Sequence, residues 1–112
     1  MLLTLAFRHL VVKKGRSLFL LLGYGLGVGV MKPVETGVGP GGPLDALALR
    51  EAAGVDVALA EVCPESFALA AAPAVAARHE GREVDRAAMT RAFRRLAARH
   101  DWLVVEGAGG LL

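Results

Sequence analysis

The sequence WLVVEGAGG at residues 102–110 gives the strongest indication of fold class. Trp102 to Val105 is a continuous apolar run of strand length, as expected for a parallel strand that is covered on both faces. Glu106 and the glycine-rich turn Gly107 to Gly110 follow it directly. In open α/β sheets, ligands bind outside the carboxyl ends of parallel strands. The stretch therefore predicts an α/β fold with a charged site where this strand ends.

A second apolar run ends in a similar way. Leu26 to Met31 stops at Lys32, within MKPVETG at residues 31–37. Lys32 and Glu106 would then both stand at strand ends, the position where such sheets place their ligand chemistry. A lysine and a carboxylate there suggest a site for an anionic substrate that carries a metal ion.

Helix signals lie between the two runs. Asp45 before Ala46 to Ala53, with Gly54 at the end, marks a helix that Asp45 would cap. Pro73 to Glu80 is a second helix, and Asp85 is the expected N-cap of a third. The apolar face of the third helix carries Met89, Phe93, Leu96 and Ala97. A helix followed by a buried strand is typical of α/β proteins.

Chain length, cysteine content and charge limit the number of domains, the redox compartment and the partners that can be expected. With 112 residues the chain is one small domain. Its only cysteine, Cys63, cannot form an internal disulfide, which fits a reducing compartment. The basic residues of the first segment are not interleaved with aromatic ones, so no nucleic-acid partner is expected.

Residues 1–25 form a basic and apolar leader ahead of a domain at residues 26–112, and this leader has two interpretations. Ser17 to Met31 carries no charge, but as a helix its 15 residues would span roughly 22 Å, short of the ~30 Å hydrocarbon core. One interpretation is a membrane-type helix. The other is a short helix near Ser17 to Leu22, a glycine-rich turn and a buried strand from Leu26 to Met31.

Five motifs follow one another along most of the chain: GVMKPVETG, DALALREAAG, VCPESFALAAAP, EGREVD and DWLVVEGAGGLL. In this order they resemble the central part of dethiobiotin synthetase, from about residue 29 to residue 112. The resemblance implies a partial P-loop-NTPase-like parallel sheet with flanking helices. Residues 1–31, especially LAFRHLVVKKGRSLFLLLGYGLGVGVM, resemble instead the N-terminal segment of an ABC-transporter permease.

The family resemblance also implies a reaction of biotin biosynthesis. Dethiobiotin synthetase is a ligase that closes a cyclic urea from 7,8-diaminononanoate and CO2 with ATP and Mg2+. The positions that match the family's site are Lys32 for catalysis, Thr36 and Gly109 for the substrate, Asp45 and Glu106 for Mg2+, and Gly107 and Gly110 for the cofactor. Backbone N–H groups of such a glycine turn can approach an anion closely.

The sequence departs from the family at the phosphate-binding loop. The family's loop ends in Gly-Lys-Thr, whereas the nearest triplet here is Gly15-Arg16-Ser17. The chain also stops at Leu112, before the family's second half. We therefore expect a truncated or degenerate copy with little activity alone. Such a copy would be cytoplasmic, with the diamine, CO2 and ATP as its partners if it is active, and a homodimer is compatible with the resemblance.

Two alternatives stay open at this point. A second chain could supply the missing loop and complete a working ATP-dependent ligase. The chain could instead be a non-enzymatic module related to the permease segment, associated with the inner membrane through residues 10–31.

Overall fold

The computed structural model describes residues 10–14 and 28–108. Strand β5 (Trp102–Glu106) is the middle strand of a three-stranded sheet. It pairs in parallel with β2 (Val28–Met31) and antiparallel with β1 (Leu10–Lys14). Both apolar runs that predicted the fold are therefore neighbouring parallel strands.

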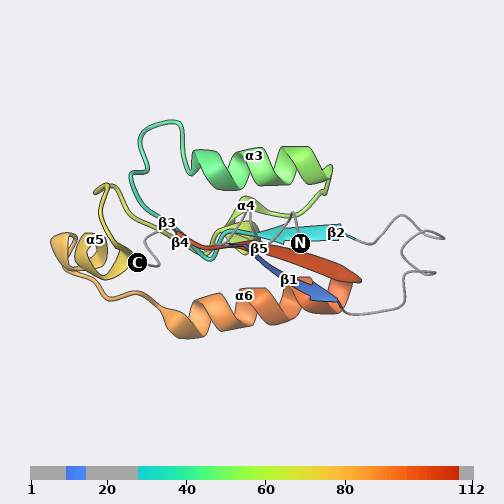
Figure 1. The fold of residues 1–112 in the computed structure, drawn as a ribbon. Coiled ribbons are helices and arrows are strands. Elements are labelled where there is room, and N and C mark those ends of the chain that lie inside the picture. The colour runs from blue at the N-terminus through green and yellow to red at the C-terminus, as the bar shows by residue number, and fades with distance from the viewer. Residues whose placement is uncertain (1–9, 15–27, 109–112) are drawn as a thin grey trace.

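Helices cover both faces of this sheet, as the α/β prediction required. Helix α3 (Leu44–Ala53) lies on one face and α6 (Arg86–Arg99) on the other (Figure 1). The short helix α4 (Leu59–Val62) joins the main core. That core is made of the buried side chains of Val30, Met31, Ala46, Val57, Val62, Cys63, Ala92, Leu96 and Leu103. The predicted α/β architecture with a parallel sheet and flanking helices is confirmed.

A second, two-stranded parallel sheet stands beside the first. It pairs β3 (Val34–Glu35) with β4 (Glu65–Ser66), with Val34 opposite Glu65. Helix α5 (Pro73–His79) packs against it. The buried side chains of this second core are Val34, Phe67, Ala76 and Ala77. Strand β3 begins only two residues after Lys32, so the chain enters this small sheet directly after the end of β2.

Helix boundaries follow the sequence signals, with one correction. The Asp85 carboxylate accepts a hydrogen bond from the N–H of Ala88 at 2.9 Å and caps α6 as predicted. Gly54 ends α3 with φ 67°, a conformation that glycine adopts without strain. The prediction that Asp45 is the N-cap of α3 is wrong. The helix begins at Leu44, two residues before the predicted first residue Ala46, so Asp45 lies in the first turn and its side chain does not cap.

Strand β1 is the described part of the leader. Its residues 10–14 lie ahead of Ser17 to Met31, the candidate membrane-type helix, and they pair with β5, Leu10 opposite Glu106 and Lys14 opposite Trp102. An unpaired edge of β5 offers backbone hydrogen bonds that a strand can satisfy. No helix within residues 10–14 and 28–108 is long and apolar enough to cross a membrane. The predicted helix near residues 17–22 lies outside the described residues.

Candidate functional site

Lys32 is the centre of the candidate site. It follows β2 directly, and its backbone N–H donates to the carbonyl of Val62 at 2.8 Å. Its side chain is only 6% exposed. A buried ammonium must find acceptors, because an uncompensated charge in the interior is costly.

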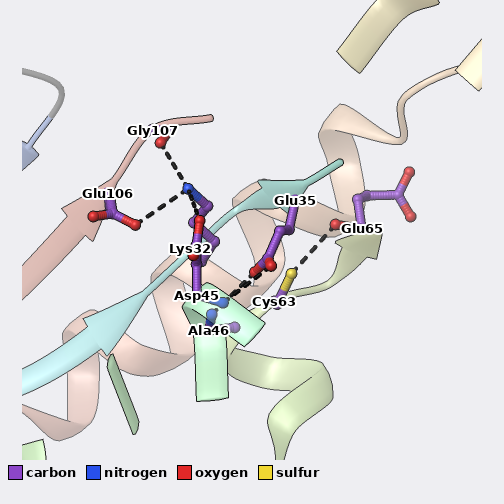
Figure 2. A network of polar contacts seen from close by, with 8 residues as sticks. All are labelled: Lys32, Glu35, Asp45, Ala46, Cys63, Glu65, Glu106 and Gly107. Atoms are coloured by element: carbon purple, nitrogen blue, oxygen red, sulfur yellow. Dashed lines mark hydrogen bonds and ion pairs between the residues drawn. The ribbon is translucent and has the colours of Figure 1, made fainter. Parts of the chain in front are cut away.

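Three acceptors surround the Lys32 ammonium (Figure 2). Nζ lies 3.3 Å from Oδ2 of Asp45 and 3.2 Å from Oε1 of Glu106, and it donates to the carbonyl oxygen of Gly107 at 3.0 Å. The structure therefore brings together the residue predicted for catalysis and both residues predicted for the metal. One ammonium between two carboxylates leaves this cluster with a net negative charge.

The sheet register explains why two of these residues meet. Met31 is opposite Val105 in the parallel pair β2 and β5, so the next residues, Lys32 and Glu106, are at the same edge. Asp45 arrives by another route, since it lies in the first turn of α3, which packs over β2. The site therefore lies at the carboxyl ends of two neighbouring strands, beside the start of a helix. This is the edge of the sheet where α/β proteins bind ligands.

The donor set fits Mg2+. This ion prefers hard oxygen ligands and is usually held by one or two carboxylates, with water and substrate phosphates completing its shell. The Asp45 and Glu106 side chains are 61% and 32% exposed, so water can reach both. Among the described residues there is no cluster of three or more side chains that could hold a metal by themselves. A cation here would need ligands from a bound substrate or from water.

The remaining predicted residues are less closely connected. Within the described parts of the chain, the half-buried Thr36 makes no hydrogen bond or ion pair with the Lys32 cluster. Gly107 takes part through its carbonyl oxygen, which Lys32 binds, whereas its backbone N–H was the predicted anion donor. Gly109 and Gly110 lie outside the described residues. Their roles, and that of Thr36, stay predictions.

Glu35 belongs to the site and was missed by the sequence reasoning. This buried side chain accepts hydrogen bonds from the backbone N–H groups of Asp45 and Ala46, each at 3.0 Å. No local signal indicated this contact, because the sequence offers Asp45 as the cap and only the structure places Pro43, which has no capping side chain, before the helix. The acceptor for the first turn therefore had to come from elsewhere in the chain.

Cys63 lies next to this network, in the main core. Its thiol donates to the carbonyl oxygen of Glu65 at 3.3 Å. The pKa of the Cys63 thiol is raised from 9.0 to about 11, first because the group is buried and second because the Glu35 carboxylate is near; Lys32 acts in the opposite direction. The thiol is therefore neutral at physiological pH and is not a nucleophile in this state.

We expect Cys63 to resist alkylation while the chain is folded. A pKa of about 11 in place of 9.0 lowers the thiolate fraction near neutral pH by about 100-fold, and burial blocks access as well. Iodoacetamide labelling at pH 7.5, followed by mass spectrometry, should be at least about 100-fold slower than in urea. Equal rates in the two conditions would contradict a buried thiol.

The raised pKa of Cys63 also predicts a pH dependence of stability. The Cys63 thiol ionises at lower pH in the unfolded chain than in the folded chain, so the free energy of unfolding should fall as the pH rises from 9.0 toward 11.

Comparison with known proteins gives a consistent set of matches. A family model described as an AAA domain matches residues 16–112. A protein of Anaeromyxobacter dehalogenans (strain 2CP-C) named ATP-dependent dethiobiotin synthetase is 56% identical over 82 residues, which is 73% of this chain and 37% of that protein. Proteins of the same name from Anaeromyxobacter sp. (strain Fw109-5) and Thermodesulfovibrio yellowstonii are 52% and 40% identical, each over 79% of this chain. The chain spans 40% and 38% of the length of these two relatives.

Proposed function

We propose a function for this chain from one premise: it belongs to the AAA domain family and, over most of its length, is dethiobiotin synthetase-like. The proposal is that residues 28–108 carry the lysine and the metal-binding carboxylates of a dethiobiotin-synthetase-type site. The reaction would be ATP-dependent closure of a cyclic urea from 7,8-diaminononanoate and CO2. Turnover by this chain alone should be low, because residues 1–112 contain no Gly-Lys-Ser or Gly-Lys-Thr loop to hold the phosphates.

One observation carries the proposal. Lys32 binds Asp45 and Glu106 at the same time, at 3.3 and 3.2 Å, where parallel strands end. These are the three positions at which the family resemblance places a catalytic lysine and two magnesium ligands. A surface lysine without a role would be mostly exposed, whereas this side chain is 6% exposed.

Each side chain would have a separate task. Asp45 and Glu106 would hold Mg2+, which supplies positive charge that phosphate oxygens need during phosphoryl transfer. Lys32 would orient an anionic group of the substrate and stabilise the charge that develops on it. Since Lys32 is held by three acceptors on different elements, its position is set before a substrate arrives. A cytoplasmic location and a homodimer belong to the same proposal.

Glu106→Gln tests the proposal directly. The amide keeps the size of the side chain but loses the negative charge, so we expect the dissociation constant for Mn2+, used as a probe of the magnesium site, to rise at least about tenfold. Any ATP-dependent formation of cyclic urea from the diamine and bicarbonate should disappear with it. Electron paramagnetic resonance measures the first, and mass spectrometry of the product measures the second.

A matched variant separates the site from general charge effects. Glu83→Gln removes the same charge from an exposed residue that makes no contact with the Lys32 side chain in the described part of the chain, so it should leave both measurements unchanged. The proposal fails if the unmodified chain forms no more ATP-dependent urea than a heat-denatured sample. It also fails if the two variants bind Mn2+ equally well.

A further inference from the structure

Glu35 uses both oxygens of its carboxylate to hold the beginning of α3. It lies on β3 and is 7% exposed. Oε2 accepts the backbone N–H of Asp45 and Oε1 accepts that of Ala46, both at 3.0 Å (Figure 2). A buried carboxylate that receives two well-formed hydrogen bonds is fixed in one orientation, because moving it would leave a buried charge without partners.

These two N–H groups need an acceptor from outside the helix. The first N–H groups of any α-helix have no partner within it, and Pro43 at the N-cap provides none. A negative charge at this end is also favoured by the helix dipole. Glu35 therefore caps α3 from strand β3. Unlike a capping residue next to the helix in sequence, it links α3 to β3 by hydrogen bonds.

The hydrogen bonds of Glu35 affect the site through Asp45, whose side chain pairs with Lys32. The Asp45 side chain is 61% exposed, so packing does not hold its carboxylate near Lys32. Its backbone, in contrast, is held by Glu35. Lys32 and Glu35 lie three residues apart in one short segment, so that segment supplies both the ammonium and the group that places its partner.

We propose that Glu35 is a positioning residue: it fixes the first turn of α3 so that the Asp45 carboxylate stays beside Lys32 and is ready to bind a divalent cation. The part that concerns the cation rests on the proposed function. The placement of Asp45 against Lys32 does not, and it can be measured without any metal. Loss of Glu35 should loosen the site as well as the helix.

The chain offers a matched control in Glu65. This residue lies on β4, paired with β3, and is also buried, at 9% exposed. Its Oε1 accepts the backbone N–H of Asp85 at 2.8 Å and so ties down the beginning of α6. Asp85 makes no contact with Lys32 in the described part of the chain. Glu65→Gln therefore removes a comparable buried charge and helix tie outside the site.

The first experiment compares Glu35→Gln with Glu65→Gln. Both should lower the melting temperature by at least about 5 °C, because each loses a charged acceptor at a helix start. Only Glu35→Gln should raise the Mn2+ dissociation constant, by about tenfold, the cost typical of losing a group that orients a metal ligand. The proposal is overturned if folded Glu35→Gln binds Mn2+ within twofold of the unmodified chain, or if Glu65→Gln weakens binding equally.

A second variant separates positioning from capping. In Glu35→Gln combined with Pro43→Ser, a serine at the N-cap can accept a first-turn N–H and restore the helix start. It cannot restore the tie to β3. We expect the melting temperature to recover while Mn2+ affinity does not. Recovery of both would show that Glu35 is only a cap, and this double variant also replaces Glu35→Gln if the single variant does not fold.

A metal-free measurement keeps the two proposals distinguishable. If the unmodified chain does not bind Mn2+, the metal part of the proposed function fails, but the placement of Asp45 is still testable. Acetylation of Lys32 by acetic anhydride, read by mass spectrometry, should be several-fold faster in Glu35→Gln and unchanged in Glu65→Gln, because a loosened contact opens more often. Equal protection of Lys32 in both variants would reject the positioning role.

Discussion

Replacing Lys32 by methionine is expected to reduce any ATP-dependent urea formation by about 100-fold or more, the usual effect of removing a group that stabilises developing charge. Methionine fills the space of the lysine stem but has no charge. Asp45 and Glu106 lose the ammonium that they share, and the Gly107 carbonyl loses its donor. Stability should fall by about 1–3 kcal/mol, as expected when hydrogen bonds to a charged group are lost. Product assays and urea denaturation measure the two effects.

Lys32→Arg and Arg94→Met provide the controls. Arginine keeps the charge in a larger, planar group, so it should retain more stability than methionine while still impairing turnover. Arg94 is exposed on α6, and its replacement should change neither quantity measurably. Unchanged turnover in Lys32→Met would remove this residue from the proposed chemistry, whatever its effect on folding.

Phe67→Ala is expected to cause the largest loss of stability, about 3–5 kcal/mol, the range for truncating a buried phenylalanine. The Phe67 side chain is 1% exposed and is the largest in the second core, and the Arg82 guanidinium carbon lies 4.4 Å from the centre of its ring. Total stabilities of small domains are about 5–15 kcal/mol, so this loss could leave much of the chain unfolded at 37 °C. Urea denaturation followed by circular dichroism measures it.

Phe67→Ala should also disturb the site, because the backbone of Phe67 is hydrogen-bonded to the strand that carries Glu35. The N–H of Phe67 donates to the Glu35 carbonyl oxygen at 2.9 Å. Phe67→Leu keeps an apolar group in the second core and should cost less than Phe67→Ala, because it leaves a smaller cavity. Arg82→Ala removes the cation above the ring, worth about 0.5–1 kcal/mol at an exposed position, together with the exposed contacts of Arg82 to the Ser66 carbonyl oxygen and to Glu80. A loss in Phe67→Ala no greater than in Arg82→Ala would contradict the buried position of the ring.

Local patterns predicted most of the elements. The described part of the apolar run at residues 26–31 is β2, the run at residues 102–105 lies in β5, and the helix expected after Asp85 is α6, because strand runs and helix caps are encoded by neighbouring residues. Strand β1 was not predicted, since its extended form depends on the edge of β5, which lies about ninety residues further along the chain. Nothing in the local sequence of this basic and apolar segment indicates that it pairs with β5.

The residues of the site could be identified from local sequence motifs. The motifs around Lys32, Asp45 and Glu106 are short and ordered, and their similarity to one family was sufficient to select them. Their contacts with one another depend on the three-dimensional fold. Lys32 and Glu106 are separated by 74 positions and meet only through the register of two parallel strands. Glu35 acquires its role only because the first turn of α3, without a local cap, packs against it. Contacts of this kind depend on how whole elements pack, and a local pattern cannot encode them.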